Sequence, residues 1–96
     1  KGKFSVFLTE LKWRPYAHVA INIIKGHIFY EAKNNSKALD SFCDAIRFYT
    51  KISDALKVKN KSQDIAICKL LIGKIFGEKG LLLDSLIWHL QALYDF

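Results

Sequence analysis

The chain has 96 residues, of which 51% are hydrophobic and 25% charged, with one Pro and five Gly. This composition is typical of one packed globular domain and excludes a disordered chain, because it supplies enough apolar side chains for a single core. No segment approaches the ~18 uninterrupted apolar residues of a membrane span, and the N-terminus lacks the features of a signal peptide. We therefore expect a soluble protein that does not insert into a membrane.

The sulfur-containing residues bear on two questions, the origin of the chain and its location. The chain has no Met, even at position 1, which favours excision from a longer protein. Its two cysteines, Cys43 and Cys68, fall within apolar helical patterns, where a free thiol behaves as a small hydrophobic group. A disulfide between them is not favoured, and this fits the reducing cytoplasm.

The net charge of +6 and the isoelectric point near 9.4 raise the question of a nucleic-acid or anionic-membrane partner. The basic residues are spread along the chain, with one local cluster at Lys57, Lys59 and Lys61 between two helical patterns. Such a charge run is usually a solvated turn. Nucleic-acid binding is therefore kept as an alternative and not as the leading interpretation.

The spacing of apolar residues predicts five helices. Between Phe4 and Leu11 they recur at i, i+3, i+4 and i+7, which indicates a short amphipathic helix. We expect it to end near Trp13, because the residue before Pro15 disfavours the helical conformation. A second helix is expected from Tyr16 to about Lys33.

Three further helices follow. The third runs from the N-cap candidate Ser36 to Leu56, and the fourth from the N-cap candidate Ser62 to Gly80. Gly80 suits the left-handed residue that often follows a helix C-terminus. The fifth runs from Leu81 to Phe96. No sustained period-two alternation bounded by hairpin turns occurs, so the predicted fold class is all-α.

The last predicted helix is apolar almost all round. Such a helix must be covered on more than one side, and the other helices of so short a chain can cover about one of them. We expect further sequence or a partner chain to hide the remainder. This predicts an association surface at Leu86, Trp88 and Leu90, with self-association as one outcome.

An internal repeat relates the second and third predicted helices to the fourth and fifth. The first copy starts at Gly26 and the second at Gly73, and in both the next repeated positions follow 3, 12 and 19 residues later. The equivalent pairs are therefore Gly26 and Gly73, Phe29 and Phe76, Ala38 and Ser85, and Ala45 and Ala92. A small residue at a helix crossing lets two helices approach to ~8–10 Å, and an aromatic residue fills the gap beside it. The copies lie 47 residues apart.

This spacing resembles the tetratricopeptide repeat, in which a small residue and an aromatic on the first helix meet Ala, aromatic and Ala positions on the second. Segments Lys79–Leu86 and Gln91–Leu93 look like the second-helix pattern of that family. Ser85, His89 and Asn22 depart from it. The 47-residue separation, against 34 in the standard repeat, is closer to the long-repeat relatives.

The resemblance implies one helical-repeat domain over residues 1–96. It would comprise an N-terminal helix at 1–15, a first repeat at 16–58 and a second repeat at 62–96, as part of a longer array. Antiparallel helical hairpins of tetratricopeptide type are therefore the expected architecture.

In this family the first helix of each repeat lines a concave groove, so the resemblance also implies a peptide-binding surface. The matching positions are Ala20, Ile23, His27, Tyr30, Glu31, Ile67, Leu70, Lys74, Gly77 and Glu78. The Lys and Asn pair with which some members clamp a terminal carboxylate is replaced by Ile23 with His27 and by Leu70 with Lys74. The groove is therefore expected to take a hydrophobic or amphipathic segment of a protein partner.

The sequence offers no constellation typical of catalysis. His18, His27 and His89 have no Cys or second His at a metal-ligand spacing, and no Gly-rich phosphate loop is present. We expect no enzymatic activity, no metal and no cofactor. The leading prediction is a protein-interaction scaffold. The alternative is a basic helical domain that binds nucleic acid or forms the regulatory part of a transcription factor.

Overall fold

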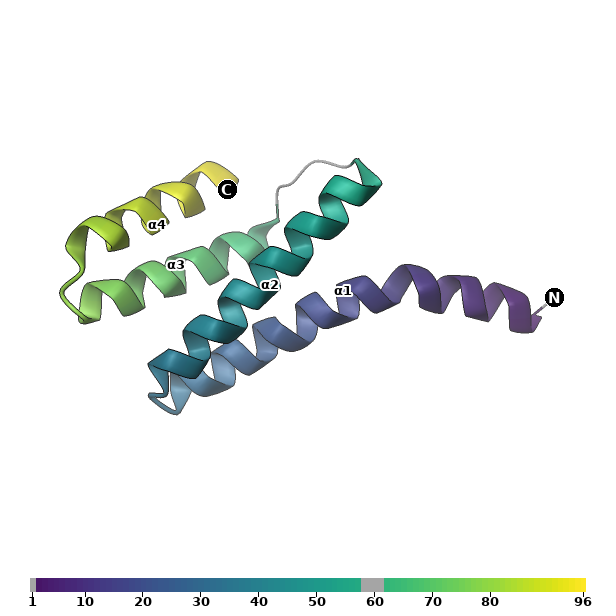
Figure 1. Cartoon of the computed structure of the whole chain (residues 1–96), viewed down its shortest axis with the longest axis horizontal. Coiled ribbons are helices and arrows are strands. Elements are labelled where there is room, and N and C mark those ends of the chain that lie inside the picture. The colour runs from purple at the N-terminus through teal and green to yellow at the C-terminus, as the bar shows by residue number, and fades with distance from the viewer. Residues whose placement is uncertain (1, 58–61) are drawn as a thin grey trace.

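The computed structural model describes the backbone of residues 2–57 and 62–96 and the side chains of 16–57 and 62–96. Within these residues it forms four helices: α1 (Gly2–Glu31), α2 (Asn35–Leu56), α3 (Gln63–Glu78) and α4 (Leu82–Asp95). Consecutive helices pack against one another, so that one hairpin of α1 and α2 meets a second of α3 and α4 through α2 and α3 (Figure 1). The prediction of an all-α fold is confirmed.

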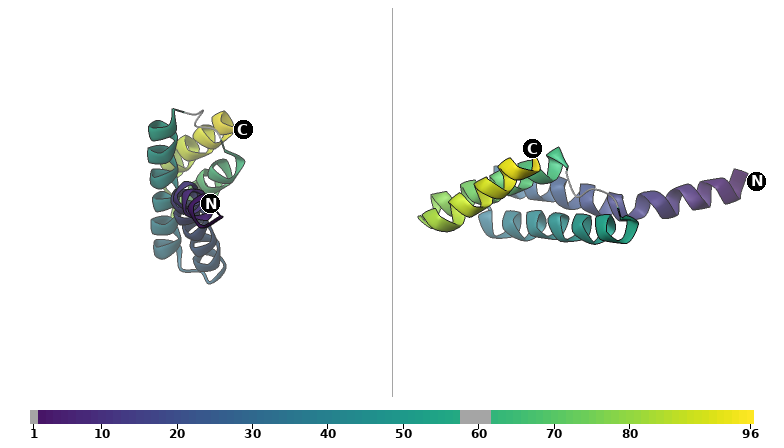
Figure 2. Two further views of the ribbon diagram at one scale, coloured as in Figure 1. Left: turned by 90° about the vertical axis from the view of Figure 1, so that its right-hand side faces the viewer. Right: turned by 90° about the horizontal axis from the view of Figure 1, so that it is seen from above.

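The prediction of a separate N-terminal helix is wrong, because α1 continues through Pro15 as one helix of 30 residues. A proline inside a helix removes one backbone N–H, but its fixed φ remains compatible with helical backbone. The N-terminal part of α1 projects past the other three helices (Figure 2), which explains the long dimension of the 56 × 28 × 16 Å molecule. The stripe predicted between Phe4 and Leu11 belongs to side chains outside the described residues.

The two hairpin turns are equivalent at a separation of 47 residues. Lys33 and Gly80 both adopt the left-handed conformation, with φ of 64° and 81°. The helices on either side also end and begin 47 residues apart. The left-handed residue predicted at Gly80 is confirmed, and Lys33 adopts the same conformation although it carries a side chain.

Backbone hydrogen bonds repeat across the two turns in the same way. The Asn34 N–H donates to the Phe29 carbonyl at 2.8 Å, and the Leu81 N–H donates to the Phe76 carbonyl at 2.9 Å. Both bonds close the turn on the residue five positions earlier. The internal repeat found in the sequence is therefore also a repeat of backbone structure.

The N-caps differ in part from those predicted. Asn34 and not Ser36 caps α2, because the Asn34 side chain accepts a hydrogen bond from the Lys37 N–H at 3.3 Å. Ser62 is the N-cap residue of α3, as predicted, although its hydroxyl makes no capping hydrogen bond. Lys57 ends α2 with φ of 54°.

The core runs across both hairpins. One cluster joins α2 to α3 through the fully buried residues Ala38, Phe42, Cys68, Ile72 and Ile75. A second cluster joins α1, α2 and α3 through Val19, Ala45 and Ile65. The hairpins are thus held together mainly by apolar contact.

Glycines allow the close approach of helices within each hairpin. A Cβ at Gly26 would overlap the Phe42 ring, at 2.9 Å from Cζ and closer still to Cδ1. A Cβ at Gly73, the equivalent position, would lie 3.0 Å from Cε1 of His89. Phe42 and His89 also lie at equivalent positions of the repeat, so each glycine faces a ring of its own hairpin in the same arrangement.

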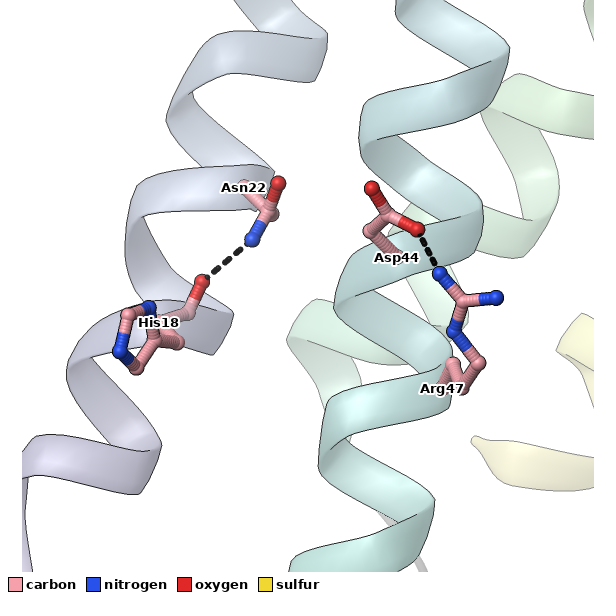
Figure 3. Close-up of polar contacts among 4 residues, drawn as sticks. All are labelled: His18, Asn22, Asp44 and Arg47. Carbon is pink, nitrogen blue, oxygen red and sulfur yellow. Dashed lines mark hydrogen bonds and ion pairs between the residues drawn. The ribbon is translucent and has the colours of Figure 1, made fainter.

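Several polar contacts of the described side chains are local to one helix. The Asn22 side chain donates to the His18 carbonyl at 2.8 Å, so that its amide is partly satisfied inside α1 (Figure 3). Arg47 forms an exposed ion pair with Asp44 on α2 (Figure 3). In the second hairpin an ion pair between Lys69 and Asp95 joins α3 to α4 in a largely buried position.

Candidate protein interaction surfaces

Several of the predicted groove residues lie where α1 approaches α3, a region that we call the seam. Ile23 is half-buried and packs against both core clusters. Tyr30 is half-buried too, and the Nζ of Lys74 lies 5.9 Å from the centre of its ring. The two helices therefore approach each other here, with one groove residue from each at the point of approach.

An apolar hollow of about 220 Å³ opens at one end of this seam. Its lining comprises Tyr16, Val19, Ala20, Ile23, Tyr49, Ser62, Asp64 and Ile65. Ala20 and Ile23 were predicted from the sequence, whereas the α2 and α3 residues were not. They come from other helices, so a pattern within one helix carries no signal for them.

A smaller hollow of about 120 Å³ opens at the other end of the seam. It is polar, and its lining comprises Tyr30, Glu31, Lys33, Asn35 and Glu78. The structure brings together three residues of the predicted groove here, because α1 and α3 both end at this point. Two carboxylates and one ammonium group thus surround a single polar opening.

The remaining groove residues lie in neither hollow. His27 is exposed and holds its ring edge-on to Phe42, with the ring centres 5.5 Å apart. Ile67 is 40% exposed, and Leu70 is half-buried.

A broad apolar face is uncovered on α4. Its members are exposed by 44% to 77% and comprise Leu82, Leu83, Leu86, Ile87, Leu90, Leu93 and Tyr94. At on the order of 100 Å² each, they expose roughly 700 Å², which is more than the largest patch of a typical monomer. Leu86 and Leu90 of the predicted association surface belong to it. Trp88 does not, because it is half-buried and packs against the core.

Neither thiol is activated for chemistry. Burial raises the pKa of Cys68 to about 12, and the Asp64 carboxylate adds to this increase. Partial burial raises the pKa of Cys43 as well, with contributions from Asp40 and Asp44, although this side chain reaches the surface. Both groups therefore stay protonated near neutral pH, whereas a nucleophilic cysteine needs a lowered pKa.

Among residues 16–57 and 62–96, no three His, Cys, Asp or Glu side chains meet in a way that could hold a metal ion. In the described part of the chain, every helix is also too short or too polar to cross a membrane. Comparison of the chain with family models, with curated proteins and with solved structures finds no match. Arguments about function therefore start from the surfaces described above.

Proposed function

We propose that this protein is a cytoplasmic interaction scaffold whose α1/α3 seam binds a segment of a partner protein. The observation that carries the proposal is the apolar hollow of about 220 Å³ at one end of that seam. Small-molecule and cofactor sites usually measure ≈ 300–1,000 Å³, so this hollow better suits one apolar anchor side chain of a peptide.

The two ends of the seam define what such a segment would present. Ile23 at the apolar hollow and Glu31 at the polar one are eight residues apart on α1, or about 12 Å along the helix. An extended segment covers this distance in about four residues. The partner would place an apolar side chain between Tyr16 and Tyr49, and a polar or basic group at Glu31.

The described surface that contains the seam carries little net charge. The chain has 15 basic and nine acidic residues. Nine of the basic and eight of the acidic ones lie in residues 16–57 and 62–96. The excess of positive charge therefore lies in residues 1–15 and 58–61, outside the part of the chain whose side chains are described. Phosphate contacts need a basic face, and the nearly neutral surface around the seam does not offer one.

We also propose that the two hairpins are long tetratricopeptide-type units. Three observations support this: the 47-residue period, the equivalent turns, and the pairing of Gly26 with Phe42 and of Gly73 with His89. Stacked units of this kind present their first helices side by side, as a binding surface requires.

The test is a peptide-display selection on the immobilised chain, followed by affinity measurements with the enriched peptides. Ala20→Phe fills the apolar hollow from an exposed position, and Ala17→Phe, on the same helix but outside the hollow, is the matched control. We expect Ala20→Phe to weaken binding by about tenfold or more, the loss of one buried anchor, and Ala17→Phe to leave it unchanged.

Salt separates this proposal from the nucleic-acid alternative. An apolar anchor predicts an affinity that changes by less than about threefold between 50 and 500 mM salt, whereas phosphate contacts predict a steep fall. Enriched peptides that bind Ala20→Phe as well as the unmodified chain would refute the seam as the binding site.

A further inference from the structure

The two repeats differ in which of their equivalent residues are covered. On α3, Cys68 and Ile75 are fully buried against the first hairpin, and Leu71 packs beside them. The residues 47 positions earlier on α1 carry the same apolar character but are exposed. They are Ile21 at 50%, Ile24 at 57% and Ile28 at 61%.

The converse holds for the second helix of each hairpin. Leu39 and Ile46 of α2 are partly buried and pack against the core where α3 covers them. Their equivalents on α4 are Leu86 and Leu93, exposed by 54% and 70%. The two hairpins are joined by one face of α3 and one face of α2. The equivalent faces of α1 and α4 are both exposed.

These exposed faces lie at opposite edges of the molecule. Figure 1 shows α4 on the side of α3 that faces away from α1. The hairpins also share their turn geometry and the position of a glycine against a ring. The exposed faces of α1 and α4 are therefore the counterparts of the buried faces of α3 and α2. Repeat units that contact only their neighbours can be stacked by repeating one interface.

We infer that a second copy of this chain docks the α1 face of Ile21, Ile24 and Ile28 onto the α4 face of Leu86 and Leu93, as α3 docks onto α2. This contact joins different surfaces of the two copies and is heterologous. Such an interface leaves a free half at each end and generates open assemblies unless the rotation closes a ring.

The area involved sets the strength of the association. Five side chains at on the order of 100 Å² each amount to roughly 500 Å² of apolar surface before the polar rim is counted. Stable interfaces bury ≈ 1,200–2,000 Å² in total, so this one belongs to the weak class. Association should therefore depend on concentration over the range of about 10 µM to 1 mM.

The outer stripe of α4 is not part of this contact. It comprises Leu83, Ile87, Leu90 and Tyr94, whose equivalents on α2 are Ser36, Asp40, Cys43 and Arg47. A substitution in this stripe is therefore a control on the same helix. It also reports on the competing arrangement, in which α4 pairs with α4 of another copy about a twofold axis.

Sedimentation equilibrium of the 96-residue chain and three exposed-site variants tests the inference, with circular dichroism as the check on folding. Leu93→Glu blocks the α4 face, Ile24→Glu blocks the α1 face, and Leu90→Glu is the control in the outer stripe. We expect the unmodified chain and Leu90→Glu to exceed the mass of a dimer at high concentration. Leu93→Glu and Ile24→Glu should each remain monomeric.

The decisive sample is an equimolar mixture of Leu93→Glu and Ile24→Glu. Each variant retains the half-interface that the other has lost, so the mixture should form a one-to-one complex and nothing larger. A mixture that stays monomeric overturns the inference, as does an unmodified chain that stays monomeric at about 1 mM. Loss of association in Leu90→Glu with retention in Ile24→Glu would instead assign the twofold α4 pair.

Discussion

Replacing Gly26 by Ala should destabilise the protein through contact with Phe42. The substitution improves helix propensity by about 1 kcal/mol, since Gly is the poorest ordinary residue in a helix interior. Its Cβ, however, would overlap the Phe42 ring, which is fully buried and cannot swing into solvent. Overpacking of a core costs typically 1–3 kcal/mol, and the upper part of this range applies here. We expect a net loss of about 1–2 kcal/mol.

Gly73→Ala provides the matched comparison. Its Cβ would stand 3.0 Å from the exposed His89 ring and 3.2 Å from the Ser85 carbonyl oxygen, so these contacts are less severe than the overlap at Gly26. The propensity gain then offsets most of the contact cost, and the free energy of unfolding should stay within about 0.5 kcal/mol of the unmodified value. The two equivalent glycines should therefore differ because their partners differ in burial.

Urea unfolding followed by far-ultraviolet circular dichroism measures both effects. A double-mutant cycle with Phe42→Leu adds a direct test, because a smaller partner should relieve the overlap and reduce the cost of Gly26→Ala by at least about 0.5 kcal/mol. The reasoning fails if Gly26→Ala is as stable as Gly73→Ala, or if its cost is the same in the Phe42→Leu background.

Three further outcomes are expected from the same unfolding assay. Lys33→Gly should stabilise the protein by about 0.5–1 kcal/mol and Gly80→Ala should destabilise it by a similar amount, because both positions are left-handed; opposite signs would contradict the turn geometry. Asp95→Asn should cost about 1–3 kcal/mol by leaving Lys69 unpaired in a largely buried position, and replacing both residues by apolar ones should recover most of this loss. Because burial raises the pKa of Cys68 from 9.0 to about 12, the thiol ionises in the unfolded chain at a lower pH than in the folded one. The free energy of unfolding is therefore unaffected by this group below pH 9 and falls as the pH rises from 9 towards about 12. Between pH 8 and 10 the unmodified chain should thus lose about 1 kcal/mol more than Cys68→Ala, and equal losses would contradict the burial of the thiol.

Much of the fold could be predicted from local features of the chain. Helical periodicity is a property of neighbouring residues, so the helix from Asn35 to Leu56 was predicted to within two residues of its start. The glycine stop at Gly80 and the 47-residue repeat were readable for the same reason. Local rules failed at Pro15, where continuous helix prevailed over the restriction on the preceding residue, and at Ser36, where Asn34 took the cap two residues earlier.

The candidate site depended on how the helices cross. The apolar hollow takes Tyr16 from α1, Tyr49 from α2 and Ile65 from α3, and no pattern within one helix links these residues. Trp88 shows the same limit, since an apolar helix predicts a buried side but not which residue occupies it.

The sequence by itself determined that the chain is helical, where most helices begin and end, and that one hairpin is followed by a second of the same design. It could not determine which faces are covered. Ile28 and Ile75 are the same residue type at equivalent positions of the repeat, yet the first is 61% exposed and the second fully buried. Their difference arises because α3 packs against a neighbouring hairpin, whereas nothing within residues 2–57 and 62–96 covers the same face of α1. This is a property of the tertiary structure that residue identity and periodicity do not encode.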